Sequence, residues 1–162
     1  MSGYTEVLQV IGATIIFSLI LTTANRFMLT NTQRQVGSEI EISGVTLAQD
    51  FIEEAKLRPF DASTADGEIP LDIPGDFTAA PFAQTTVTNR SLITTFEGFN
   101  GYTETINTGL GEYTIEAEVD YVLASNLNQV TTSKTRHKRL TVSINNPSLN
   151  SPITLQYTRT YN

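Results

Sequence analysis

Few side chains in this sequence are spaced for catalysis. The chain has one histidine, His137, and no cysteine. A serine–histidine–acid triad needs a histidine beside both partners, whereas His137 lies in a basic run from Arg136 to Arg139. Without cysteine there are no disulfides, thiolate zinc sites or cysteine nucleophiles. We therefore expect a protein that is not an enzyme and has no cofactor.

One cluster of acidic residues is a candidate for a calcium-binding loop. Asp61, Asp66 and Glu68 surround Gly67. Their spacing does not match the ligand positions of an EF-hand. We therefore interpret the segment as a solvated acidic loop and expect no metal site there.

The other charged groups are expected on solvated surfaces. Glu116, Glu118 and Asp120 alternate along a predicted strand, where a wet sheet surface accounts for them. The net charge of -7 argues against nucleic acid as a partner, because binding phosphates needs a basic face. The local exception is the run from Arg136 to Arg139, which we interpret as a solvated basic strand end.

The elements that carry these residues begin with a long apolar helix. From Val7 to Asn25 the chain has no charge, between Glu6 and Arg26. At about 1.5 Å per residue this run covers about 28 Å, close to the hydrocarbon thickness of a bilayer. A secretory signal would begin with Lys or Arg, and neither precedes Glu6. We expect a membrane-spanning or filament-core helix. A cleaved signal and a buried helix of a soluble protein are the alternatives.

The helical pattern continues toward Pro59 but becomes amphipathic. Apolar residues recur at intervals of three and four and predict a face that packs on a sheet: Val36, Ile40, Leu47, Phe51 and Ala55. Gly44 lies in the same stripe and marks a possible bend. Pro59 lacks a backbone donor and disfavours helical geometry at Arg58, so the helix is expected to end there.

Alternating apolar and polar residues predict three strands in the last third of the chain. The segments are 112–123, 139–145 and 152–161. Each has one apolar face and one polar face, as expected of an antiparallel sheet that is buried on one side.

The segment between helix and strands has a weaker pattern. Several prolines and glycines from Pro59 to Pro81 predict a loop on the surface. Farther on, Val87, Leu92–Ile93 and Phe96 permit one short strand or hairpin. We therefore treat 59–110 as a loop region.

These elements predict an α+β fold in which a long N-terminal helix packs on a small antiparallel sheet. We expect residues 1–34 to form the apolar helix and residues 35–162 to form a globular head. The head contains the amphipathic half-helix up to residue 58, the loop region 59–110 and the antiparallel sheet 111–162.

The order of these features resembles the type IV pilin superfamily. The resemblance rests on the apolar helix with Glu6 near its start, on the run VTLAQDFIEEAKLRPFD from Val45 to Asp61, and on the strands that begin near Glu112, Leu140 and Ile153. It covers most of the chain outside 62–110 and is nearest to minor pilins and type II secretion pseudopilins.

This resemblance implies a structural subunit of a filament. Such a subunit resides in the cytoplasmic membrane and then enters an extracellular filament of identical subunits, with the help of a pilus or secretion assembly machinery. It also implies that Glu6 sets the axial register by pairing with the α-amino group of a neighbouring subunit. The alternative from the residues alone is an interfacial charge where the span begins.

The residues expected to form the filament core are the apolar side chains of the uncharged run: Val7, Leu8, Val10, Ile11, Ile15, Ile16, Phe17, Leu19, Ile20 and Leu21. Two alternative functions remain at this stage. One is a minor pilin or type II secretion pseudopilin, and the other is a membrane-anchored surface binding module.

Overall fold

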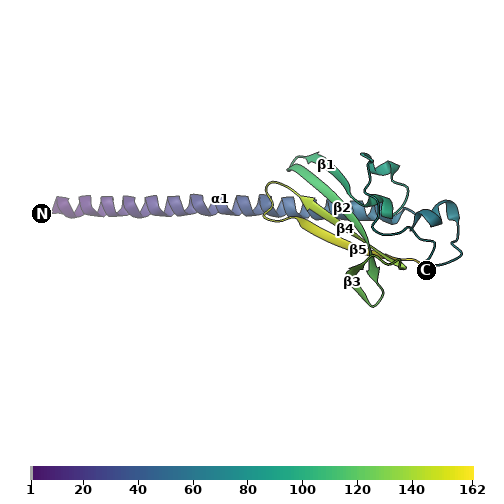
Figure 1. Cartoon of the computed structure of the whole chain (residues 1–162). Helices are drawn as coiled ribbons and strands as arrows, with labels where there is room; N and C mark the ends of the chain where they lie inside the picture. The colour runs from purple at the N-terminus through teal and green to yellow at the C-terminus, as the bar shows by residue number, and fades with distance from the viewer. Residues whose placement is uncertain (1) are drawn as a thin grey trace. The chain divides into compact units, whose positions relative to one another are not determined.

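A computed structural model describes residues 2–162, except for the side chains of Ser2 and Asp66. Met1, which begins the predicted segment 1–34, lies outside the described residues, as does the side chain of the acidic candidate Asp66. Within the described part, the chain forms one α-helix, three short 3-10 helices and five strands (Figure 1).

Helix α1 runs from Ser2 to Lys56 and has 55 residues. Beyond it, the amide of Arg58 donates to the carbonyl of Ala55, three residues back, at 3.2 Å. Pro59 follows and has no amide to donate. The prediction of one long helix that ends just before Pro59 is confirmed.

The chain divides into two compact units. The helical unit is Met1–Glu39, and the head unit is Ile40–Asn162. The sequence placed this division after residue 34, and the structure places it after Glu39. Among the helix residues whose side chains are described, Ile40 is the first to be buried, with an exposed fraction of 4%, so it belongs with the core of the head unit.

The strands of the head unit form one antiparallel sheet: β1 (Tyr102–Thr108), β2 (Gly111–Leu123), β3 (Asn126–Thr131), β4 (His137–Asn145) and β5 (Ile153–Thr160). Their order is β1-β2-β4-β5, and β3 pairs with the end of β2. The register places apolar residues side by side, as where Ala117 faces Val142 and Val142 faces Leu155. The three strands predicted from alternation are found as β2, β4 and β5.

The segment 59–110 differs from its prediction as a loop. It contains β1, whose sequence is mostly polar and therefore hides the alternation. The positive φ of Gly111, 111°, lies at the start of β2, where only glycine adopts it readily. The short strand permitted around Val87, Leu92–Ile93 and Phe96 does not form, and the described residues there include the 3-10 helices η2 (Arg90–Leu92) and η3 (Glu97–Phe99).

Within the head unit, α1 from Ile40 onward packs on the apolar face of the sheet (Figure 1). Ile40, Phe51 and Ala55 are buried. Leu47 packs against the core while remaining partly accessible. The Tyr113 hydroxyl adds a specific contact, since it donates to the Ile40 carbonyl at 3.1 Å.

Gly44 has a packing role in this contact. A Cβ atom at this position would lie 2.7 Å from Ile153 Cδ1. Glycine therefore allows the helix backbone to approach β5 more closely than a larger residue would. The sequence marked Gly44 as a possible bend in the helix. In the structure, the close approach of the helix backbone to Ile153 is the reason for a glycine at this position.

The core of the head unit predicts that this unit folds without the helical unit. A fragment of residues 35–162 keeps Ile40 and every buried residue C-terminal to it, and it lacks the uncharged run. We expect a soluble monomer with a single cooperative unfolding transition. Gel filtration and thermal circular dichroism measure both properties. An aggregated or unfolded fragment would contradict the division into two units.

Candidate functional site

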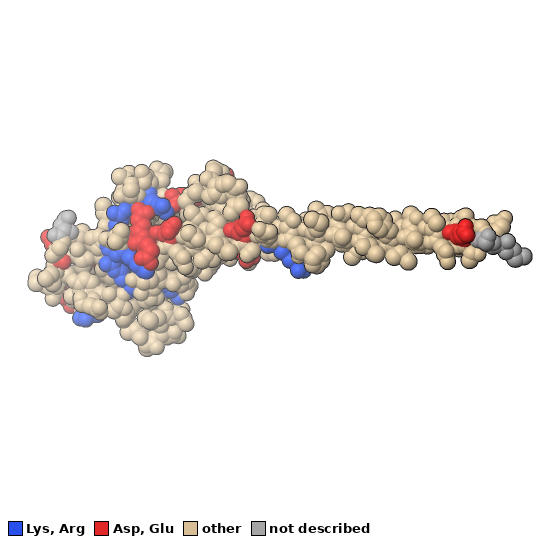
Figure 2. All heavy atoms as spheres, turned by 180° about the vertical axis from the view of Figure 1, so that it is seen from behind, with Lys and Arg blue, Asp and Glu red and all other residues tan. Residues whose placement is uncertain are grey.

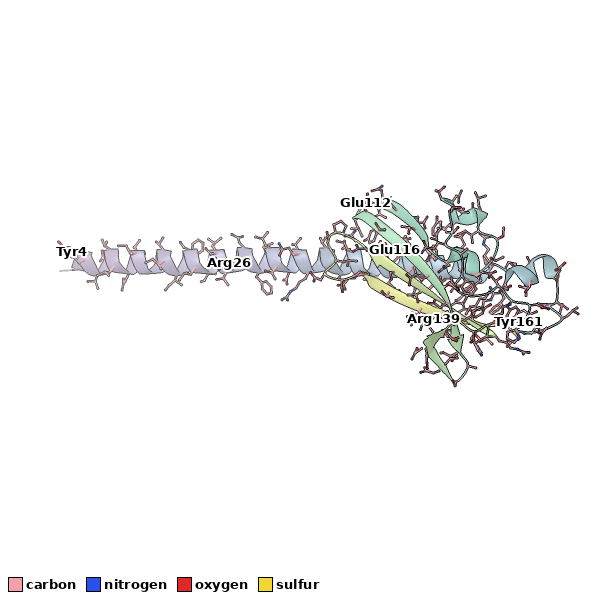
Figure 3. The ribbon with its side chains drawn as sticks, in the orientation of Figure 1. Tyr4, Arg26, Glu112, Glu116, Arg139 and Tyr161 are labelled. Atoms are coloured by element: carbon pink, nitrogen blue, oxygen red, sulfur yellow. The ribbon has the colours of Figure 1, made fainter. Side chains whose placement is uncertain are left out.

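The first candidate site is the surface of the uncharged run in the helical unit, from Val7 to Asn25, which is largely apolar. The ten residues predicted for a filament core are all exposed, from 46% at Leu21 to 69% at Leu8. Figure 3 shows side chains standing out from both sides of the ribbon in this unit, where Tyr4 and Arg26 are labelled. In Figure 2 this unit is tan over most of its visible surface, which means that few charged atoms interrupt it.

Hydroxyl groups within this surface are satisfied by the helix itself. Thr14 Oγ1 donates to the carbonyl of Val10 at 2.7 Å, and Ser18 Oγ donates to that of Thr14 at 2.8 Å. Thr22 and Thr23 make the same contact four residues back. A hydroxyl that already donates within its own helix loses little when water is removed. These positions are therefore compatible with an apolar surrounding.

By length and composition, α1 is able to cross a membrane. Its most apolar window of 18 residues has a mean hydropathy of 2.1, and none of that window is buried within the chain. Glu6 and Arg26, which bound the uncharged run, are both exposed. Val36, predicted to pack on the sheet, is 44% exposed and belongs to the helical unit.

The second candidate site is a buried charge cluster in the head unit, formed by Lys138, Asp61 and Glu97. Lys138 Nζ lies 2.5 Å from Asp61 Oδ2 and 2.9 Å from Glu97 Oε2. The exposed fractions of these residues are 0%, 0% and 6%. The Lys138 ammonium also donates to the Phe60 carbonyl at 2.9 Å. Two carboxylates thus surround one ammonium group inside the protein.

This cluster corrects two predictions from the sequence. Asp61 is not part of a solvated acidic loop, and Lys138 is not part of a solvated strand end. On β4, Lys138 has the same phase as Leu140 and Val142, so its side chain enters the core with theirs. That phase was a sequence signal for burial. Glu97 lies in the 3-10 helix η3, where no regular sequence pattern predicts that its side chain is buried.

Local backbone structure holds the Asp61 carboxylate in place. Asp61 caps the 3-10 helix η1 (Ala62–Gly67), and its Oδ1 accepts from the Ser63 amide at 3.1 Å. The Thr78 amide donates to both carboxylate oxygens at 3.0 Å. Burial by itself would raise the pKa of Asp61, but the hydrogen bond and charge of Lys138, together with these amides, lower it below its usual value.

Aromatic rings enclose the Lys138 ammonium. Its Nζ lies 4.6 Å from the ring centroid of Phe60, 5.0 Å from that of Phe82 and 5.5 Å from that of Tyr121. Rings at these distances attract a cation and exclude water. Burial, followed by the charges of Asp61 and Glu97, raises the pKa of the Tyr121 hydroxyl well above its usual range. Tyr121 is therefore neutral at physiological pH and donates to the Thr78 carbonyl at 2.8 Å.

The other candidate residues lie apart from this cluster. His137 is half-buried, with Nδ1 2.9 Å from Thr160 Oγ1. Glu116 and Glu118 are exposed on β2, where Figure 3 labels Glu116. Glu68 is exposed after η1. Among the described residues, no group of three His, Cys, Asp or Glu is arranged to hold a metal ion.

A second, more accessible charge network joins α1 to the irregular segment within the head unit. Arg90 Nε lies 2.9 Å from Glu54 Oε2, and Arg90 Nη1 lies 3.1 Å from Glu104 Oε1. The three side chains retain between 20% and 30% exposure. Solvent screens such pairs, so each contributes little to the stability of the head unit.

Comparison with known proteins gives no further indication of function. No family model, curated protein or solved structure matches the chain.

The buried cluster predicts that Lys138→Met strongly destabilises the head unit. Methionine fills a similar volume but leaves Asp61 and Glu97 buried without a cation. Breaking a buried ion pair in this way costs about 3–5 kcal/mol of unfolding free energy. Urea unfolding of the fragment 35–162 measures it. The control is Arg136→Met in the same basic run, where the exposed side chain should change stability by about 0.5 kcal/mol or less. Equal effects of the two substitutions would contradict the prediction.

Proposed function

We propose that this protein is a structural subunit of an extracellular filament of the type IV pilus kind, in which the helical units of identical subunits pack together as the core. The subunit resides in the cytoplasmic membrane before assembly. The proposal involves no catalytic step, cofactor or nucleic acid. A pilus or secretion assembly machinery would move the subunit from membrane to filament.

The observation that carries this proposal is the exposed apolar surface of the helical unit. From Val7 to Asn25 the helix presents apolar side chains on all sides and no charge. Soluble monomers rarely expose an apolar surface of this extent, because burying it is favourable by roughly 25 cal/mol per Å². Something must cover it. Lipid does so before assembly, and other copies of the same helix do so afterwards.

Identical copies are suitable occupants because the apolar surface surrounds the helix. A helix with one apolar face would pair once and leave no further surface for contact. This surface offers contacts in several directions, and heterologous contacts that do not close produce an open helical assembly. Close packing between helices would replace the contacts with lipid. The head unit has its own core, so it needs no help from the helical unit to remain folded outside the membrane.

Glu6 fits this proposal as a register residue. A carboxylate beside the apolar run is unfavourable in a dry filament core unless a positive group compensates it. The α-amino group of a neighbouring subunit would supply that charge and set the axial position of one subunit against the next.

A membrane-anchored surface binding module is the second candidate, because α1 is also long and apolar enough to serve only as an anchor. A minor pilin or type II secretion pseudopilin, present in few copies, is the alternative within the filament class. Electron microscopy of sheared surface material separates these possibilities. Abundant filaments of this chain favour the proposal, and a monomer that only detergent extracts favours the anchor.

The proposal predicts that a charge in the middle of the uncharged run prevents assembly. Ile15→Lys places an ammonium where neither lipid nor helix offers a partner, at a cost of about 2.5–3.5 kcal/mol. We expect filament yield to fall by about a hundredfold. The control is Gln33→Lys, which adds the same charge outside the run. Immunoblots of sheared material, normalised to membrane content, measure the yield. Normal filaments from Ile15→Lys would refute the packed core.

The register role predicts that Glu6→Gln slows assembly while the subunit still folds and inserts. Glutamine keeps the shape of the side chain but removes the charge that pairs with the neighbouring amine. Glu39→Gln, an exposed position in the same unit, serves as the control. Filament yield is compared at equal membrane levels of subunit. Wild-type yield from Glu6→Gln would leave Glu6 as a marker of the membrane boundary.

A further inference from the structure

The proposed function makes no use of the buried cluster, whose groups could react with one another. An amine and two carboxyl groups meet in the interior of the head unit, where Lys138 and Asp61 are fully buried and Glu97 is 6% exposed. Lys138 Nζ is within hydrogen-bond distance of both Asp61 Oδ2 and Glu97 Oε2. A primary amine that contacts a carboxyl group can form an amide with it when the leaving hydroxyl receives a proton. The third group of the cluster can carry that proton.

We propose that Lys138 and Asp61 condense to an isopeptide bond, and that Glu97 acts as the proton carrier. The bond would join the side chain of a residue just after α1 to a side chain of β4. It forms within one chain and needs no oxidant, cofactor or second enzyme, because condensation only releases water.

The step begins with a proton shift from the Lys138 ammonium to the Asp61 carboxylate, which leaves the net charge of the cluster unchanged. The lone pair of Nζ then attacks Cγ of Asp61 and forms the C–N bond. Glu97 accepts a proton from the nitrogen and delivers it to the Asp61 hydroxyl. The C–O bond breaks, water leaves, and Glu97 is again a carboxylate. The products are one secondary amide and one water molecule.

The hydrogen bonds assign the acceptor role to Asp61. Oδ1 of Asp61 accepts from two backbone amides, those of Ser63 and Thr78, at 3.1 and 3.0 Å. These donors can stabilise the negative charge that develops on this oxygen when the amine attacks. Glu97 has a single backbone donor, the Ala62 amide, on Oε1 at 2.7 Å. Its other oxygen, Oε2, faces Nζ, where a proton carrier is needed.

The surroundings favour both the attack and the persistence of the product. Burial disfavours charge on an amine and on a carboxyl, whereas the contact with Lys138 and the backbone amides keeps Asp61 charged at rest; the neutral pair is therefore the minor form from which the attack starts. Groups held in contact react as if at an effective concentration of about 10⁵–10⁸ M. The rings of Phe60, Phe82 and Tyr121 keep water from returning. Hydrolysis of the amide would need that water.

The bond would change how the head unit resists unfolding. Asp61 and Lys138 are 77 positions apart in the chain, so the bond closes a long loop that includes β1, β2 and β3. A cross-link of this kind restricts the unfolded chain most when its loop is long. Heat or denaturant would then leave the segment from Asp61 to Lys138 tied together.

Intact mass spectrometry of the full chain tests the proposal. The protein is purified in detergent, checked for fold by circular dichroism and denatured before measurement. We expect the wild type to weigh one water less than its sequence. Lys138→Arg keeps the positive charge but has no nucleophilic amine, and Glu97→Gln keeps the shape but cannot take up the proton. Both variants should have the full mass of their sequences.

Peptide mapping locates the change. After protease digestion, the wild type should yield one branched peptide that joins the segment around Asp61 to the segment around Lys138. A folded wild type with the full sequence mass overturns the proposal. So does a water loss located elsewhere, for example at Asp66–Gly67, where a succinimide would also remove water. A bond from Lys138 to Glu97, or condensation in Glu97→Gln, overturns the assigned roles.

Discussion

The ammonium group of Lys138 must be compensated inside the head unit, because an isolated charge in a protein interior costs several kcal/mol even after relaxation. β4 cannot supply the compensation, since its neighbouring inward residues are apolar. Asp61 and Glu97 bring it from the irregular segment. Two points of that segment are therefore tied to one lysine. The cap of η1, the position of η3 and the rings of Phe60 and Phe82 are all arranged around Nζ.

The uncharged run of the helical unit, from Val7 to Asn25, is governed by the opposite constraint, which is the absence of charge. Its hydroxyls donate within the helix, and its apolar side chains remain exposed within the chain. Such a surface is favourable only in lipid or against other apolar helices. The head unit instead completes its own core from one face of α1 and the sheet. The head unit thus has its own core, whereas the apolar run of the helical unit needs lipid or other helices to cover it.

These two constraints fit the proposed filament in different ways. The helical unit would supply the contacts between subunits, while the head unit would have to remain folded on the outside without lipid or chaperone. A buried charge cluster contributes little net stability by itself but strongly disfavours arrangements that leave a charge unpaired. Close packing at Gly44 and the ring contacts of Phe51 with Phe99 and Tyr102 supply further attachment between helix and sheet side. The proposed function rests on this division of roles.

The sequence by itself determined the elements with a regular period. A helix pattern ending before Pro59 and alternating strands such as 112–123 are local features, because side chains repeat every 3.6 or 2 residues. The packing face of Ile40, Phe51 and Ala55 followed from the same rule. Only the tertiary structure decided the irregular segment: β1 is polar and edge-like, and η2 and η3 have no period. The tertiary structure also decided which charged side chains are buried. Asp61 and Lys138 resemble solvated residues when each is considered with its neighbours in sequence, and they become a buried pair because the fold brings together groups that lie 77 positions apart.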